Sequence, residues 1–296
     1  MSAETSHLTT APAAGGRTRT IALVVILLAS FMDLLDVTIV NVTVPAIRAE
    51  LGASPAQVQW MLAGYTLAFA LGIITGARLG DLYGYRRVFL VGIAGFVAAS
   101  ALCGAAPTAD ALVAARVVQG VFAAAMVPQV LSQIQLMYQP HERGGAMAAF
   151  SSLSGLAAAA GPILGAALLE ADVSGLGWRS VFWLNVPVGL VALVVAARVL
   201  PQGRGAARPR LDLAGMGICA AGLLLILFPL IAGSEDVPGR SGRTCAWWRV
   251  WPYWPVFTAT SGGSVSADAS RWWRCPSSRC ARWAAGCSCS SCSSCR

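Results

Sequence analysis

Three charged residues lie inside stretches of this chain that are otherwise apolar: Asp33 and Asp36 in one stretch, and Arg116 in another. The two aspartates are three positions apart, so they share one face of a helix. Burial favours the protonated form of a carboxyl group, and a neighbouring carboxylate adds to that preference. We therefore predict that the pair takes up and releases a proton near neutral pH, as a proton-coupling site. A structural pair hydrogen-bonded to neighbouring helices is the alternative.

An arginine inside a membrane needs an anionic partner. In a hydrocarbon core of about 30 Å, Arg116 lies roughly 10 Å and Asp36 roughly 8 Å from the same outer end of their helices. Because the depths match, we expect Arg116 to contact an acidic residue of the first stretch and to modulate its affinity for protons. A static buried ion pair would explain the same residues.

The elements that must position these side chains are seven apolar stretches, each of about 20 residues and so long enough to cross a bilayer as a helix. They run approximately over residues 21–44, 57–77, 88–106, 109–133, 146–169, 181–200 and 213–232. Hydrophobic residues make up 56% of the chain and charged residues 11%, against roughly 25% charged in soluble domains. The composition predicts an all-α polytopic membrane protein.

Arginines concentrate in every second connection between these stretches, beginning with the N-terminal segment. By the positive-inside rule, we expect the N-terminus in the cytoplasm of a multi-pass protein of the plasma membrane. The formal net charge is +8. Since these arginines flank membrane spans, the charge indicates topology and does not indicate a nucleic-acid partner.

The segment between the second and third stretches combines three charged residues, Asp81, Arg86 and Arg87, with two glycines, Gly80 and Gly84. We expect a short loop in which both glycines make turns, so that the flanking helices form a tight antiparallel hairpin. A simple anchor that obeys the positive-inside rule is the alternative.

This segment resembles the signature loop between helices 2 and 3 of major facilitator superfamily transporters, although Leu82 stands where an Arg is common. Four further segments are similar to motifs of the same superfamily, in the same order along the chain: 35–45, 116–120, 161–165 and 178–189. The first and fourth resemble the branch of fourteen-helix drug/proton antiporters in particular, and the third resembles the fifth-helix signature of antiporters in this superfamily.

The resemblance implies an N-terminal six-helix bundle, one further transmembrane helix, and export of amphipathic, often cationic compounds in exchange for protons. It implies that Asp33 or Asp36 carries the proton and that Arg116 modulates it. The hinge and gate on the cytoplasmic side would be formed by Gly80, Asp81, Gly84, Arg86 and Arg87. The bending, close-packing surface of helix 5 would comprise Gly161, Pro162 and Gly165, and the candidates for lining a substrate cavity are Asn41, Gln119 and Gln129.

The expected organisation has five parts: a disordered cytoplasmic leader over 1–20, the six-helix bundle over 21–200, a basic cytoplasmic linker over 201–211, a seventh transmembrane helix over 212–233, and an irregular tail over 234–296. The tail is rich in Cys, Trp, Arg and Ser. A frameshift is our interpretation, because GC-rich codons for the Cys-Ser run at 287–295 encode leucines in another frame. A Cys-rich metal site and an external disulfide-bearing domain are the alternatives.

Two functions remain open. The first is a proton-coupled exporter that works by alternating access, impaired by truncation; the second is a non-transporting membrane fragment or an assembly partner of a split transporter. The expected partners are a small-molecule substrate, protons and the lipid bilayer, with a homodimer or a missing second half as a possibility. No cofactor or metal is predicted, and without a nucleotide-binding loop or catalytic triad outside the spans the chain does not resemble an enzyme.

Overall fold

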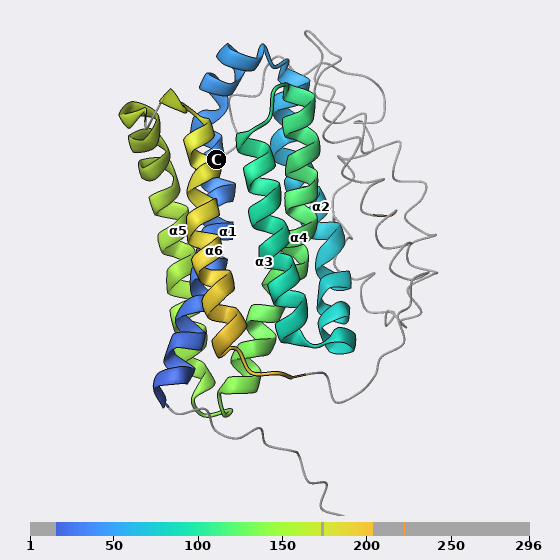
Figure 1. Cartoon of the computed structure of the whole chain (residues 1–296), viewed down its shortest axis with the longest axis vertical. Coiled ribbons are helices and arrows are strands. Elements are labelled where there is room, and N and C mark those ends of the chain that lie inside the picture. Colours follow the sequence, from blue (N-terminus) through green and yellow to red (C-terminus); the bar gives the residue numbers. More distant parts are fainter. Residues whose placement is uncertain (1–15, 173–174, 204–221, 223–296) are drawn as a thin grey trace, which may run out of the picture. The chain divides into compact units, whose positions relative to one another are not determined.

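The computed structural model describes residues 16–172, 175–203 and 222 of the 296-residue chain. These residues form long helices and no strand. The helices are α1 (Gly16–Leu51), α2 (Pro55–Tyr83), α3 (Tyr85–Gly104), α4 (Ala109–Met137), α5 (Arg143–Ala171) and α6 (Arg179–Val199) (Figure 1). Each is long and apolar enough to cross a membrane. The predicted all-α membrane fold is therefore confirmed for the described part of the chain.

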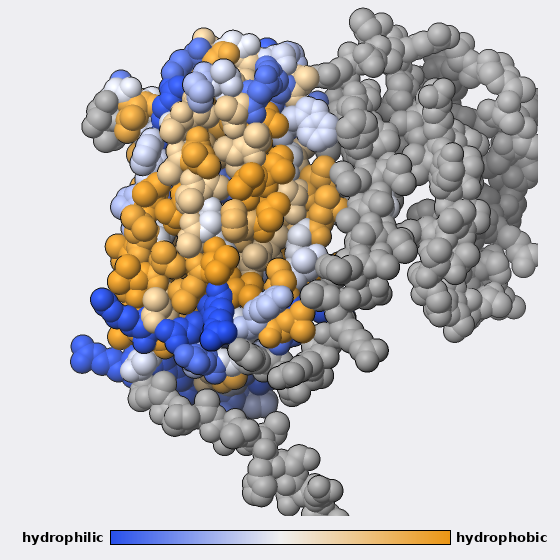
Figure 2. Space-filling model, turned by 45° about the vertical axis from the view of Figure 1, so that its right-hand side comes forward, coloured by the Kyte–Doolittle hydropathy of each residue, from blue (hydrophilic) through white to orange (hydrophobic). Residues whose placement is uncertain are grey.

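The helices lie side by side as a bundle (Figure 1). Helix α4 packs against α2 and α3, helix α1 packs against α5 and α6, and α3 joins the two groups through α6. Large apolar side chains also cover much of the outside, including Ile163, Val91 and Val191. Figure 2 shows the result: an apolar band around the middle, with hydrophilic residues gathered towards the ends. This pattern fits a bundle whose outer surface faces lipid.

Helix α2 begins with a capping box. The Ser54 hydroxyl accepts a hydrogen bond from the Gln57 backbone amide, the Gln57 side chain accepts one from the Ser54 amide, and Pro55 occupies the first helical position. Helix α4 begins similarly, because the Thr108 hydroxyl accepts from the amide of Ala111. These caps satisfy amide donors that would otherwise have no partner inside the helix.

Glycines allow α2 and α4 to pack with their backbones close together. A Cβ atom at Gly76 would lie 2.1 Å from the Ala124 carbonyl oxygen, and one at Gly120 would lie 2.4 Å from the Tyr65 carbonyl oxygen. Either methyl group would clash with backbone that has no room to move. The small residues therefore determine how α2 and α4 cross.

The described helices are longer than the apolar stretches from which they were predicted. Helix α1 begins at Gly16, so residues 16–20 of the predicted leader are helical. Arg19 explains the extension, because it donates a hydrogen bond to Glu142 and lies 3.7 Å from the ring centre of Tyr138. Apart from residue 222, the seventh span at 213–232 lies outside the described residues, as do residues 204–211 of the linker and the tail at 234–296.

One prediction about the connection between α2 and α3 is wrong. Gly80 makes no turn; it is a buried residue of the last turns of α2. Its lack of a side chain makes room for α4, since a Cβ atom there would lie 2.0 Å from Oε1 of Gln129. Gly84 alone separates the two helices, with φ of 98°, a conformation that favours glycine. The loop is short because both helices continue beyond the apolar stretches.

Candidate functional site

A cluster of polar side chains lies buried between four helices of the bundle. Asp36 of α1 is 0% exposed and Arg116 of α4 is 1% exposed. Nη1 of Arg116 donates a hydrogen bond to Oδ2 of Asp36, which makes the two a buried ion pair. The predicted contact between Arg116 and an acidic residue of the first span is thus present.

The second oxygen of the Asp36 carboxylate binds two amides. Oδ1 accepts a hydrogen bond of 2.8 Å from Nδ2 of Asn185 in α6 and one of 3.2 Å from Nε2 of Gln119 in α4. The Asn185 amide also donates to the Ser100 hydroxyl of α3 at 3.1 Å. One carboxylate therefore joins α1, α4 and α6 directly and reaches α3 through Asn185. Such satisfied partners are what a charge needs inside a bilayer.

Gln119 holds the arginine as well as the carboxylate. Its Oε1 accepts a hydrogen bond of 2.8 Å from Nη1 of Arg116, while its Nε2 donates to Asp36. The Cys103 thiol lies 3.6 Å from the same Oε1. Nε of Arg116 is buried and has no hydrogen-bond partner among the described residues. The hydrogen bonds that hold the guanidinium among these residues therefore come from Nη1, and none comes from Nε.

Asp33 has a different environment from Asp36, although both face the bundle interior. It is 4% exposed, and its Oδ1 accepts a hydrogen bond from the Tyr65 hydroxyl of α2. Within residues 16–172 and 175–203, no arginine forms a salt bridge with it. The Tyr65 ring also contacts Arg116, whose guanidinium carbon lies 4.3 Å from the ring centre. Tyr65 therefore lies between the two charged groups, with its hydroxyl on Asp33 and its ring face on Arg116.

Sequence reasoning missed Tyr65, Asn185 and Ser100. Asn185 belongs to the recognisable segment 178–189, so its presence was visible, but nothing in that motif indicates that its amide binds Asp36. Tyr65 had a weaker signal as a single phenol in an apolar stretch. Ser100 had none, because a lone serine in a helix is commonly bonded to its own backbone.

The three candidates for a substrate cavity lie in unlike places. Gln119 belongs to the ion-pair cluster. Gln129 is buried, and its Nε2 donates to the carbonyl of Gly76 at 2.7 Å and to that of Ala125 at 3.2 Å. Asn41 is exposed, and its amide donates to carbonyls of its own helix. The structure does not bring the three together.

The charged residues of the predicted gate are also separated. Asp81 accepts a hydrogen bond of 3.0 Å from the Tyr85 hydroxyl. Arg86 donates to the carbonyl of Ala197 at the end of α6, and Arg87 is exposed. Among the residues described here, Asp81 forms a salt bridge with neither arginine.

The small residues of α5 pack against α1 beside the ion pair. A Cβ atom at Gly161 would lie 1.9 Å from Oγ1 of Thr38, and one at Gly165 would lie 3.0 Å from Cγ1 of Ile39. Pro162 lies inside the helix between them. Gly161 and Gly165 therefore pack closely against α1, and the bending of helix 5 at Pro162 stays a prediction.

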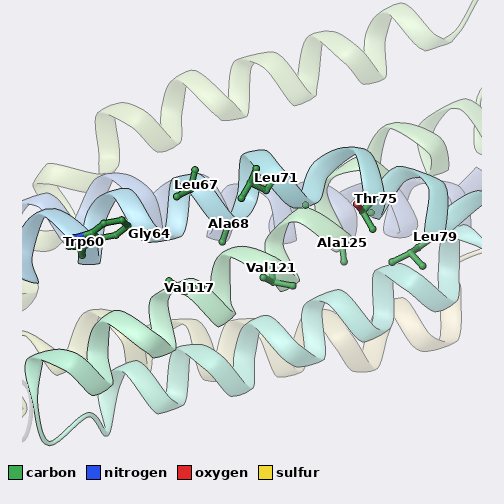
Figure 3. Close-up of a pocket in the computed structure, with 12 residues that line it drawn as sticks. Trp60, Gly64, Leu67, Ala68, Leu71, Thr75, Leu79, Val117, Val121 and Ala125 are labelled. Carbon is green, nitrogen blue, oxygen red and sulfur yellow. The ribbon is translucent and has the colours of Figure 1, made fainter. Parts of the chain in front are cut away.

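An apolar groove of about 520 Å³ runs between α2 and α4 (Figure 3). Its wall includes Trp60, Leu71 and Val121, and Thr75 supplies a hydroxyl. Gly64 and Gly76 also line it. The groove suits an apolar surface or molecule, and it contains no charged residue among those described.

Comparison with known proteins identifies the family. The model of the Major Facilitator Superfamily matches residues 26–230. The chain is 45% identical over 244 residues to the "Probable actinorhodin transporter" of Streptomyces coelicolor, an alignment that covers 82% of this chain and 40% of the relative. It is 39% identical over 230 residues to the "Tetracenomycin C resistance and export protein" of Streptomyces glaucescens, covering 77% of this chain and 42% of the relative. The chain thus spans about two fifths of the length of these relatives.

Solved structures show the same fold at low sequence identity. The crystal structure of a peptide transporter, POT, matches with a TM-score of 0.55 and 16% identity, covering 77% of this chain and 49% of that one. A bacterial homologue of the human lysosomal transporter Spinster matches with a TM-score of 0.53 and 22% identity, covering 68% and 47%. The relatives named above carry names of antibiotic transport, resistance and export, and the chain itself is a multi-pass membrane protein that belongs to the Major Facilitator Superfamily, a family of transporters and not of enzymes.

Proposed function

We propose that the described bundle is the proton-coupling part of an exporter of amphipathic small molecules. The observation that supports this best is the unequal pair of buried carboxyl groups. Asp36 is paired with Arg116, whereas Asp33 is held by the Tyr65 hydroxyl. Two neighbouring buried acids with different partners can exchange a proton as those partners move.

The proton would enter at Asp33. Protonation there removes a buried negative charge that no arginine among the described residues balances. Protonation of Asp36 instead would leave Arg116 charged and without its counter-ion, a state that costs several kcal/mol in a buried site. A movement that separates Arg116 from Asp36 makes Asp36 the acid that is protonated more readily. Proton binding at Asp36 is then coupled to that movement.

Alternating access would use the hydrogen bonds around Asp36 as the moving contact. That carboxylate joins α1 to α4 and α6, so a change in its charge alters the contacts between these helices at once. A buried network of this kind has few partial states, because each unpaired polar group costs free energy in lipid. We propose that substrate export is driven by protons in this way.

The distribution of arginines supports a cytoplasmic N-terminus at the plasma membrane. At the end of the bundle where α1 begins, the described arginines are Arg17, Arg19, Arg78, Arg86, Arg87, Arg143 and Arg198. At the opposite end, the described arginines are Arg48 and Arg179. The positive-inside rule assigns the first end to the cytoplasm.

The substrate we propose is an antibiotic or a similar amphipathic compound. The support comes from relatives whose names refer to actinorhodin, tetracenomycin C and puromycin. The apolar groove between α2 and α4 is compatible with a cavity for such a molecule once a second set of helices closes it. That second set would come from another half of the transporter or from a second copy of the chain.

Dye efflux from cells that lack their main drug pumps tests the proposal. Cells that express the chain should export a fluorescent lipophilic cation, and a protonophore should abolish the export. Asp36→Asn and Asp33→Asn should each reduce the rate by about tenfold or more, the size expected for a group that transfers protons. Asp110→Asn is the matched control, because Asp110 is exposed and its described side-chain contact is with Gln57.

The result also separates the second candidate function. Export that resists the protonophore, or that survives both aspartate substitutions, would disprove proton coupling. No export at any level of expression would instead support the non-transporting fragment or assembly partner.

A further inference from the structure

A second hollow, also of about 520 Å³, lies at the end of the bundle where α2 gives way to α3. Its wall is formed by Tyr83, Arg86, Arg87 and Leu90 of these helices and by Gln202 in the segment that follows α6. This segment is fixed in place, since the amide of Tyr85 donates a hydrogen bond of 3.0 Å to the carbonyl of Gly203. The hollow is thus a built feature with walls from three parts of the chain.

The charge of this hollow is positive. Both charged residues among its described walls are arginines. Arg86 is held by a hydrogen bond to the Ala197 carbonyl, and its Nε is buried with no partner in the described chain. Arg87 is exposed beside it. Asp81, the nearest acid along α2, already accepts a hydrogen bond from Tyr85.

The N-terminus of α3 adds to the attraction for an anion. This helix is 20 residues long and begins at Tyr85, directly after Gly84, and no side chain caps it among the described residues. The first amides of a helix carry a partial positive charge and bind phosphate readily. The Tyr85 amide is already bonded to the Gly203 carbonyl, so the first amides that follow it, together with the two arginines, are the donors at this hollow.

The apolar part of the wall points to a lipid rather than a free anion. Leu90 belongs to the wall, and Tyr83 is 58% exposed beside it. Farther along α3, Val91 is 62% exposed on the apolar band. A molecule with a phosphate in the hollow could therefore lay a hydrocarbon chain along α3. Tyrosine is common at this depth, where headgroups meet acyl chains.

We propose that this hollow binds the phosphodiester of an anionic phospholipid. The Arg86 and Arg87 guanidinium groups donate to the phosphate oxygens, and the acyl chains lie against α3. Basic pockets between membrane helices bind anionic headgroups in this manner. The bound lipid would add to the contacts that the described residues already make here, namely the hydrogen bonds from Tyr85 to Gly203 and from Arg86 to Ala197 of α6.

The experiment uses the full chain in nanodiscs of phosphatidylcholine that contain a small fraction of spin-labelled phosphatidylglycerol. Electron paramagnetic resonance measures the fraction of label immobilised by the protein. The site variant is Arg86→Gln with Arg87→Gln. The matched control is Arg17→Gln with Arg78→Gln, which removes the same charge from two exposed arginines at the same end of the bundle.

We expect the affinity for the labelled lipid to fall about tenfold or more in the site variant, because each arginine near the membrane surface attracts anionic lipid. In the control variant the affinity should stay the same. The variant with lysine at both positions should recover most of the binding, and circular dichroism should show that each variant keeps its helices. Equal losses in the two glutamine variants would overturn the proposal in favour of diffuse attraction.

A second arm distinguishes the lipid from a free anion. Inorganic phosphate at millimolar concentration should leave the immobilised fraction unchanged, because it lacks the acyl chains that occupy the apolar wall. Displacement of the lipid by inorganic phosphate would show a site for a soluble anion and would overturn the assignment to a phospholipid. Labelled phosphatidylcholine alone should show no loss in the site variant.

Discussion

The Asn185 amide donates a hydrogen bond of 2.8 Å to the Asp36 carboxylate, although 149 positions separate the two residues in the chain. Asn185 is 2% exposed, and the same amide group binds Ser100. The side chain therefore connects α6 to both α1 and α3. A carboxylate with one arginine on one oxygen and two amides on the other has nearly all its acceptor sites filled.

Replacement of Asn185 by leucine should lower the free energy of unfolding by about 1–3 kcal/mol, because it removes a donor from a buried carboxylate. Unfolding in mixed micelles of mild detergent and dodecyl sulfate, followed by circular dichroism, measures this quantity. Asn41→Leu is the control. Asn41 is exposed and bonded to its own helix, so its loss should change stability by no more than about 0.5 kcal/mol. Equal effects would contradict a special role for Asn185.

Asp36 and Arg116 should show strong coupling in a double-mutant cycle. Asp36→Asn or Arg116→Gln alone leaves one buried charge without its partner, at a cost of about 3–5 kcal/mol each. The double variant replaces both charges by amides, so its loss should be smaller than the sum of the single losses. The same unfolding assay measures all four proteins. Additive losses would mean that the two side chains do not depend on each other in the membrane.

The contact between Asp36 and Arg116 was predictable because it depends only on the depth of each residue in the bilayer. Helical rise places each residue at a level in the bilayer, and an unpaired charge at that level selects an opposite charge. The partners of Asp33 and Asn185 depend instead on how each helix is rotated about its axis. That rotation follows from the packing of glycines such as Gly120 against Tyr65, which no pairwise pattern in the sequence displays.

Helix ends were harder to predict than helix cores. Hydropathy marks where the chain can enter lipid, but a helix continues into water when its side chains find partners there. Residues 16–20 continue α1 because Arg19 binds Glu142 and stacks on Tyr138. Gly80 also belongs to α2, at a position where Gln129 occupies the space that a side chain would need.

Gly76→Ala should destabilise the bundle by about 1–3 kcal/mol, the usual cost of overpacking. The added methyl would lie 2.1 Å from the Ala124 carbonyl oxygen, so α2 and α4 must move apart. Gly144→Ala is the control, because no atom lies within 4 Å of the position of its Cβ and Gly144 belongs to α5. That change should be neutral or stabilise by about 0.5–1 kcal/mol, since alanine favours a helix. If both variants unfold alike, the close approach of α2 and α4 is not what holds these helices.

The contact between Arg19 and Glu142 should make stability depend on pH in the acidic range. The hydrogen bond from Arg19 holds the pKa of Glu142 below its ordinary value of 4.5, with the charge of the same arginine contributing. A carboxyl group whose pKa is lower in the folded protein stabilises the fold at pH values above the ordinary pKa, and that contribution disappears as the pH falls through the folded pKa.

Wild type should therefore melt at a higher temperature than Glu142→Gln at pH 7, and the difference should shrink below pH 4.5. Glu170→Gln is the control, since Glu170 is exposed, and it should leave the melting temperature unchanged at both pH values. A difference between wild type and Glu142→Gln that persists undiminished in acid would show that the contact acts through packing and not through charge.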